Sequence, residues 1–83
     1  MTVELTARAA KDLDRIQRGQ PALVQKIIAN IRSLSDNPRT GKPLVAPLKG
    51  MWSLRVGDYR IIYEFGKNKV VVLTVNHRRE VYR

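Results

Sequence analysis

The apolar positions of the chain change from a helical to a strand-like spacing near residue 50. Before that point, they recur every three or four residues within residues 21–34: Leu23, Val24, Ile27, Ile28, Ile31 and Leu34. This pattern predicts an amphipathic helix that begins at Pro21, where the missing N–H costs nothing, and that Asn37-Pro38 ends.

A strand and another helix are predicted ahead of this one. Val3 and Leu5 alternate with polar neighbours, which is typical of a short strand. Thr6 is a favourable N-cap residue, and the helix after it is expected to end at Gly19. Three apolar residues at helical spacing are expected to form the inner face of this helix: Ala10, Leu13 and Ile16.

The second half of the chain predicts three strands. Residues 51–56 and 59–65 both alternate apolar and polar side chains, and Gly57-Asp58 between them suits a two-residue hairpin turn. The apolar, mostly β-branched run at 70–75 predicts a central strand. Residues 38–50 hold three prolines and are expected to form an irregular, positively charged connection.

These elements together predict an α+β fold in the order β-α-α-β-β-β, with a helical hairpin packed on a twisted, mainly antiparallel sheet. Eighty-three residues suit a single domain, residues 1–83, with one core. Neither a signal peptide nor a membrane-spanning run is apparent in the sequence. The chain is therefore expected to be cytoplasmic and to have no membrane partner.

The net charge predicts the class of ligand. Sixteen lysines and arginines against seven acidic residues give a formal net charge of +9. Residues 39–83 hold ten basic and three acidic residues, so +7 of this total falls in that half. The electrostatic field of this excess positive charge favours polyanionic partners, because neutralising phosphates releases condensed counterions. Nucleic acid is therefore the predicted ligand.

Several kinds of chemistry are disfavoured by what the sequence lacks. It has no cysteine and one histidine, and its acidic residues show no metal-ligand spacing, so no metal site is predicted. No glycine-rich phosphate loop opens a helix, and no serine-centred nucleophile motif is present. Any catalysis is expected to proceed without a metal or a cofactor.

A group of basic and aromatic residues at the strand ends could cleave RNA without a metal. Arg60 begins one strand of the meander, and the last strand leads into His77, Arg78 and Tyr82. Histidine can move a proton near neutral pH, arginine can hold a phosphate, and tyrosine can stack on an unpaired base. Each also has a structural explanation: a surface histidine, an arginine paired with a nearby glutamate, and a tyrosine that anchors the tail.

Further basic residues are candidates for binding the RNA backbone. In the second half of the chain they are Lys49, Arg55, Arg79 and Arg83. On the first predicted helix four of them recur at helical spacing on the outer side: Arg8, Lys11, Arg15 and Arg18. A solvated helix face is the commoner explanation of such a stripe, and tracking of phosphates is the alternative.

Two segments resemble the RelE/ParE superfamily of bacterial toxins: residues 48–63, which contain Gly-Asp-Tyr-Arg-Ile-Ile-Tyr, and the ending His-Arg-Arg-Glu-Val-Tyr. The resemblance covers nearly the whole chain and implies a toxin of a type II toxin–antitoxin pair, bound by its antitoxin in a hetero-oligomer. RelE-like members enter the ribosomal A site and cleave mRNA without a metal, using the 2′-hydroxyl as nucleophile. ParE-like members share the fold but inhibit DNA gyrase.

The resemblance also implies roles for three residues. Arg60 matches the strand arginine that stabilises the transition state, and Arg78 matches the basic residue near the end of the last strand. Tyr82 matches the tyrosine that stacks on the scissile nucleotide. The expected function is therefore that of a translation-inhibiting endoribonuclease (mRNA interferase) that contacts ribosomal RNA and mRNA. A gyrase inhibitor and a plain RNA-binding domain are the alternatives.

The preceding strand departs from the family pattern. The best-known RelE enzymes have lysines there that act as base and charge stabiliser, and this chain has Met51 and Ser53. Lys49, just upstream, and His77 are the alternatives for transferring the proton. The resemblance thus implies the phosphate-binding residues but leaves the acid and base open.

Overall fold

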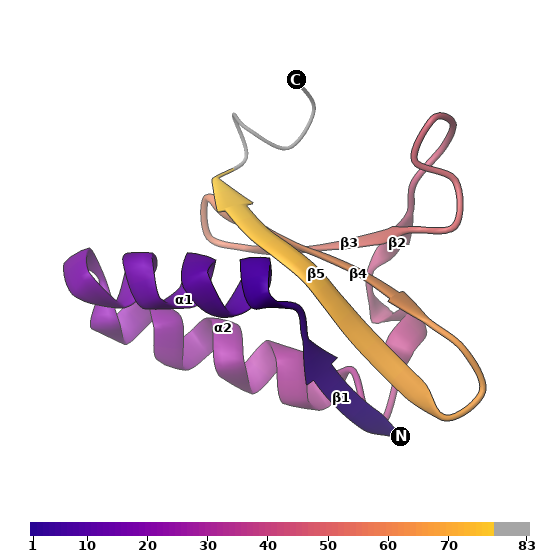
Figure 1. Ribbon diagram of the computed structural model, residues 1–83, viewed down its shortest axis with the longest axis horizontal. Coiled ribbons are helices and arrows are strands. Elements are labelled where there is room, and N and C mark those ends of the chain that lie inside the picture. The colour runs from indigo at the N-terminus through magenta and orange to yellow at the C-terminus, as the bar shows by residue number, and fades with distance from the viewer. Residues whose placement is uncertain (78–83) are drawn as a thin grey trace.

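Two helices pack side by side against one face of a five-stranded sheet in the computed structural model, which describes residues 1–77 (Figure 1). The elements are β1 (Thr2–Leu5), α1 (Ala7–Gly19), α2 (Pro21–Ser33), a 3-10 turn (Pro38–Thr40), β2 (Lys42–Pro43), β3 (Trp52–Val56), β4 (Tyr59–Phe65) and β5 (Lys69–His77). This is the predicted α+β arrangement with one additional strand, β2.

The strands follow the order β1-β5-β4-β3-β2 across the sheet. β1 and β5 run parallel and the other three pairs are antiparallel, which confirms the prediction of a mainly antiparallel sheet. β5 lies between β1 and β4, as expected of an internal strand. The irregular connection predicted over 38–50 is wrong in one respect, because Lys42 and Pro43 pair with β3.

A bulge in β5 changes which face its side chains occupy. Between Ile62 and Tyr63 of β4 the partner in β5 shifts from Thr74 to Val72, so that Leu73 is an extra residue. Residues directly opposite each other on antiparallel strands share a face. Even-numbered residues of β5 before the bulge, and odd-numbered residues after it, therefore face the helices.

Thr6 joins β1 to α1 through its backbone and its side chain. Its N–H donates to the Val72 carbonyl (3.0 Å), and its hydroxyl donates to the Leu73 carbonyl (2.6 Å). The same hydroxyl accepts the Ala9 N–H (3.0 Å), which confirms the predicted N-cap. These bonds fix the rotation of α1 so that Ala9 is buried. The prediction that Ala10 faces the core is wrong, because Ala10 is exposed.

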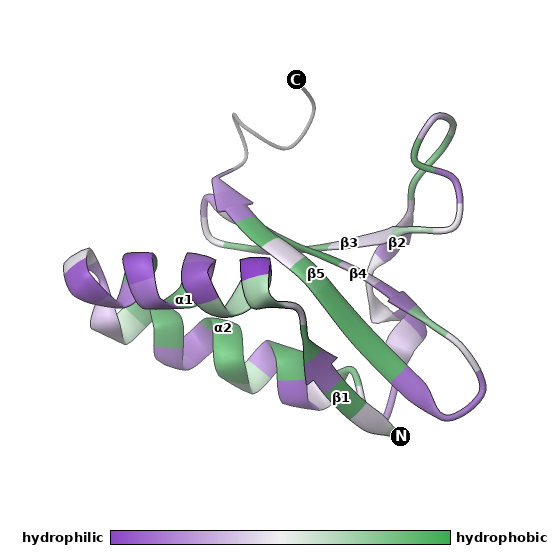
Figure 2. Cartoon of the chain, viewed as in Figure 1, coloured by the Kyte–Doolittle hydropathy of each residue, from purple (hydrophilic) through white to green (hydrophobic). Residues whose placement is uncertain are grey.

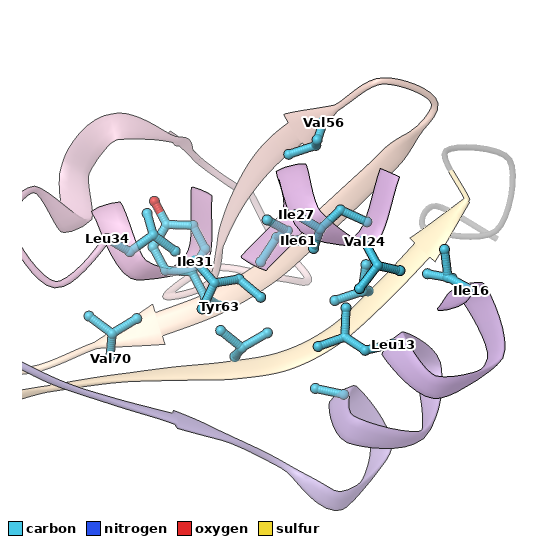
Figure 3. Close-up of a cluster of buried hydrophobic side chains, with 13 residues drawn as sticks. Leu13, Ile16, Val24, Ile27, Ile31, Leu34, Val56, Ile61, Tyr63 and Val70 are labelled. Carbon is cyan, nitrogen blue, oxygen red and sulfur yellow. The ribbon is translucent and has the colours of Figure 1, made fainter. Parts of the chain in front are cut away.

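The core lies between the two helices and the sheet (Figure 3). α2 begins at Pro21 as predicted but ends at Ser33, before the expected stop at Asn37, and a turn follows it. In Figure 2 the outer side of α1 is hydrophilic, whereas the middle of β5 is hydrophobic. The buried apolar cluster consists of Ala9, Leu13, Ile16, Val24, Ile27, Ile31, Leu34, Val56, Ile61, Tyr63, Val70, Val72 and Val75.

Candidate functional site

Arg55 and Arg60 are direct neighbours across β3 and β4, on the sheet face turned away from the helices. The register pairs Arg55 with Arg60, and Arg60 with Asn76 of β5. Ile61, which follows Arg60 in the chain, is fully buried in the core. Because successive side chains of a strand point to opposite faces, the two arginines and Asn76 form a polar row on the open face.

A cleft of about 580 Å³ lies beside this row. Ser53, Arg55 and Arg60 of β3 and β4 line it, together with the connection from β2 to β3. The residues contributed by that connection are largely apolar: Pro43, Leu44, Val45, Ala46, Pro47 and Leu48. The proline-rich connection thus converts part of the sheet face into a recess with both apolar and cationic walls.

The charge in the cleft is of one sign. Lys42, Arg55 and Arg60 line it, and within residues 1–77 no aspartate or glutamate does. Like charges directly opposite each other destabilise a sheet, and Arg55 and Arg60 are such a pair. Arg55 also donates from Nε to the Gly57 carbonyl (3.0 Å), which directs its side chain toward the hairpin turn. This arrangement favours binding of an anion such as a phosphate.

Tyr63 fixes the segment that leads into the cleft. Its hydroxyl donates to the Pro38 carbonyl (2.6 Å) and accepts the Gly41 N–H (3.1 Å). Burial raises the pKa of Tyr63 above its usual value, and the Gly41 hydrogen bond offsets only part of this, so the phenol stays a neutral donor. A β-carbon at Gly41 would lie 2.5 Å from the Ser53 carbonyl oxygen, so only glycine fits there without a backbone shift.

Lys42 belongs to this cleft, and the sequence analysis did not identify it. It pairs with Ser53 across β2 and β3, next to the row that contains Arg60. Two residues, one of them proline, show no periodicity from which a strand could be recognised. The one signal in the sequence is the neighbouring lysine and proline, a combination that protects sheet edges.

His77 lies on the other face of the sheet from Arg60. It is opposite Tyr59 in the register, and the two rings meet edge-on with 5.4 Å between centroids. Without the bulge at Leu73, the alternation along β5 would have put His77 on the same face as Arg60. The structure therefore does not bring these two candidates side by side, and proton transfer by His77 stays a prediction.

The basic residues of α1 belong to the helix layer, on the other side of the sheet from the arginine row. Arg8 and Arg15 form ion pairs with Asp12 at 3.3 and 3.2 Å, and Arg18 forms one with Asp14 at 2.9 Å. Three of the four predicted cations are thus partly neutralised. These contacts favour the interpretation of the stripe as a solvated, ion-paired helix face.

Asp12 attaches α1 to β5. Its carboxylate is fully buried and accepts hydrogen bonds from the Thr74 hydroxyl (2.6 Å) and the Val75 N–H (3.0 Å). Burial acts to raise its pKa, but these hydrogen bonds and the charges of Arg8 and Arg15 outweigh burial and lower the pKa below its ordinary value. The sequence analysis missed Asp12 because it lies among charged neighbours, as a surface residue would.

The other predicted residues lie away from the cleft or outside the described part of the chain. Lys49 is exposed in the turn before β3, and Lys11 is exposed on α1. Within residues 1–77 no three His, Asp or Glu side chains gather where they could hold a metal ion, and no helix is long and apolar enough to cross a bilayer. The candidates outside the described residues, whose roles stay predictions, are Arg78, Arg79, Tyr82 and Arg83.

Known proteins match this chain over almost all of its length. A family model described as the ParE toxin of the type II toxin–antitoxin system parDE matches residues 3–82. Toxin RelE of Mycobacterium tuberculosis is 37% identical over 84 residues, which cover 98% of this chain and 84% of the relative. Toxin RelG of the same organism is 36% identical over 86 residues, which cover 99% and 95%.

The fold also matches a solved structure. A chain in the crystal structure of the toxin–antitoxin complex RelBE2 from Mycobacterium tuberculosis aligns with a TM-score of 0.80. The alignment has 35% sequence identity and covers 95% of this chain and 92% of that chain. Sequence and fold therefore point to the same group of proteins.

Proposed function

Because the chain belongs to the RelE/ParE family of toxins from type II toxin–antitoxin systems, we propose that it cleaves mRNA in the ribosomal A site and so inhibits translation. The two curated relatives named RelE and RelG, each more than a third identical over nearly the whole chain, support the RelE-like activity. The observation that carries the proposal is the Arg55–Arg60 pair in a cleft without acidic lining residues in the described part of the chain.

In the proposed reaction the 2′-hydroxyl oxygen attacks the adjacent phosphorus and gives up its proton to a base. The bond from phosphorus to the 5′-oxygen breaks, and the leaving oxygen takes up a proton. Arg60 stabilises the negative charge that grows on the phosphate oxygens, and Arg78 contributes further positive charge. Lys49 or His77 is the proposed group that transfers the proton, although the side chain of His77 lies on the other sheet face from Arg60. Tyr82 stacks on the nucleotide.

Three further basic residues in the second half of the chain hold the substrate and the ribosome in this proposal. Arg55, opposite Arg60, contacts a neighbouring phosphate, and Arg79 and Arg83 contact RNA further along. Their contribution is electrostatic, so ribosome binding is expected to weaken steeply between low and moderate salt. A binding constant that does not change with salt concentration would contradict this account.

An antitoxin protein is the proposed second partner. The RelBE2 structure, which this chain matches at 35% identity, is named as a toxin–antitoxin complex. A formal net charge of +9 is complemented by an acidic partner, which would also shield the cleft from RNA. Binding of an antitoxin is expected to suppress cleavage.

The test adds the purified protein to a cell-free translation reaction and maps mRNA 5′ ends by primer extension. Wild-type protein is expected to produce ribosome-dependent cuts at in-frame codons, and a metal chelator should not change them. Arg60→Ala should reduce cleavage by about 10²–10³-fold, the usual effect of removing one group that stabilises a transition-state oxyanion. The matched control is Arg32→Ala, an exposed arginine in the last turn of α2, which should retain activity.

Inhibition of DNA gyrase is the second candidate function, because the matching family model is described as a ParE toxin. Intact message in the translation reaction, together with inhibition of gyrase supercoiling, would establish it in place of the nuclease. In that case Arg60→Ala would act on gyrase binding, and the cleft would be a protein-binding surface.

A further inference from the structure

Lys42 and Ser53 form a second polar pair in the cleft, next to the arginine row. They are opposite each other in β2 and β3, and both line the cleft with Arg60. Neighbouring rows on one face of a sheet lie within reach of long side chains such as lysine and arginine. Lys42 is exposed and forms no ion pair within residues 1–77.

The Ser53 hydroxyl indicates that the cleft is built for a ligand. Ser53 is 5% exposed, and its Oγ has no hydrogen-bond partner among the residues that the structure describes. A buried hydroxyl without a partner costs folding free energy, and an alanine in the same place would not. Oγ can donate one hydrogen bond and accept two, and it is covered by protein atoms here, so a ligand satisfies it once the side chain turns toward the cleft that Ser53 lines.

The chemistry of the neighbouring groups identifies the ligand as an anion. Lys42, Arg55 and Arg60 are cations, and a hydroxyl donor lies among them without an acid on the cleft lining of the described residues. Ammonium, guanidinium and hydroxyl groups are the donors that bind phosphate oxygens. The apolar residues of the connection that also line the cleft, among them Leu44 and Pro47, suit the ring of a nucleotide base.

We propose that Lys42 and Ser53 bind the scissile phosphate together with Arg60, Lys42 as a fixed positive charge and Ser53 as a hydrogen-bond donor. This inference rests on the proposed nuclease function and adds two catalytic residues to it. Lys42 provides charge and takes no part in proton transfer, so arginine can replace it. Ser53 binds the substrate through its hydroxyl, and this hydroxyl lowers the folding stability of the free protein because it lacks a partner among the described residues.

The test of Lys42 measures single-turnover cleavage on programmed ribosomes. Lys42→Met is expected to lower the cleavage rate about 100-fold, whereas Lys42→Arg keeps the charge and most of the rate. The matched control is Lys26→Met, an exposed lysine on α2, which should cleave like wild type. Lys42→Gln is measured beside them and should lose activity like the methionine variant.

The alternative role of Lys42 is to protect the sheet edge from aggregation. On that alternative, Lys42→Met would aggregate while its soluble fraction cleaved at the wild-type rate, and this result would overturn the proposal. Equal cleavage by wild type and Lys42→Gln would also overturn it, and would leave the nuclease function intact. A wild-type protein that cuts no message would overturn both.

Ser53→Ala distinguishes a substrate-binding role from a structural one. The proposal expects the melting temperature to stay the same or rise, because an unsatisfied buried hydroxyl is removed, while cleavage falls about tenfold, as for one lost hydrogen bond to a charged group. A structural hydroxyl would instead lower the melting temperature and cleavage together. That result, or unchanged cleavage, would overturn the role of Ser53.

Discussion

The α1–β5 junction and the cleft beside the arginine row both contain polar side chains, but their hydrogen bonding and charge balance differ. At the junction, the buried carboxylate of Asp12 contacts two hydrogen-bond donors of β5 and two arginines of its own helix. In the cleft, like charges face each other at Arg55 and Arg60, and the Ser53 hydroxyl has no partner among the described residues.

This difference predicts that the junction contributes mainly to stability and the cleft mainly to function. A polar network whose members are all satisfied stabilises a fold, because every group that is removed leaves its partners unpaired. A buried hydroxyl without a partner, placed beside cations, can gain a hydrogen-bond partner when an anion binds. Substitutions at the junction should therefore lower stability, and substitutions in the cleft should lower activity.

The largest effect on stability is expected at Asp12. Asp12→Ala removes the acceptor of the Thr74 hydroxyl and of the Val75 N–H, and should lower the free energy of unfolding by about 3 kcal/mol. The measurement is urea denaturation followed by circular dichroism. Asp14→Ala is the control: its ion pair with Arg18 is exposed, so a change within about 0.5 kcal/mol is expected. Equal losses in the two variants would mean that Asp12 does not fasten the helix to the sheet.

Tyr63→Phe should have the next largest effect. The substitution keeps the buried ring but leaves the Pro38 carbonyl and the Gly41 N–H without their partner, at about 1–2 kcal/mol. Cleavage should fall as well, because the segment leading into β2 is released from the core and Lys42 with it. Urea denaturation and the cleavage assay are performed on the same sample. Loss of stability with full activity would show that the cleft does not depend on this attachment.

A smaller effect is expected from pH. Because the folded-state pKa of Asp12 is lowered, its ionised form contributes stability at every pH above its unfolded value of about 3.9. This contribution is lost as pH falls through the folded-state pKa. The difference in unfolding free energy between wild type and Asp12→Asn should be constant at neutral pH and shrink below about pH 4. A difference that grows toward low pH would contradict the assignment of Asp12 as a buried carboxylate.

The smallest change in stability is expected in the cleft. Arg55→Gln removes one of two opposed charges and one hydrogen bond to the Gly57 carbonyl, so the free energy of unfolding should change by no more than about 0.5 kcal/mol. Cleavage, in contrast, should fall about tenfold through weaker binding of the substrate phosphates. A loss of stability comparable to that of Asp12→Ala would remove the distinction between the two regions.

The sequence predicted those features that local chemistry determines. The N-cap at Thr6, the proline at the start of α2 and the hairpin turn at Gly57, which adopts φ +60°, all follow from residue type and spacing. The family resemblance, confirmed by the comparisons, also singled out Arg60 as a candidate. Its position opposite Arg55 follows from the hairpin, because a two-residue turn fixes the register of its strands.

Features that depend on contacts between distant segments could not be predicted. β2 forms because its backbone pairs with that of β3. The burial of Asp12 depends on the residue at which β1 stops pairing with β5. The rotation of α1 about its axis, which buries Ala9 and exposes Ala10, is determined by the hydrogen bonds from Thr6 to β5. The sheet face on which His77 lies depends on the bulge at Leu73, and no local sequence pattern predicts this bulge.

The parallel pairing of β1 with β5 has a consequence for the timing of synthesis. Thr2 pairs with Lys69, and Leu5 pairs with Val72, so the first strand has no partner until residues 69–72 have left the ribosome. The same segment provides the bonds that hold Thr6 at the start of α1. A chain still in synthesis therefore cannot complete its sheet. On the proposed function, harm to the ribosome that produces the protein would be delayed until nearly all of the described fold has emerged.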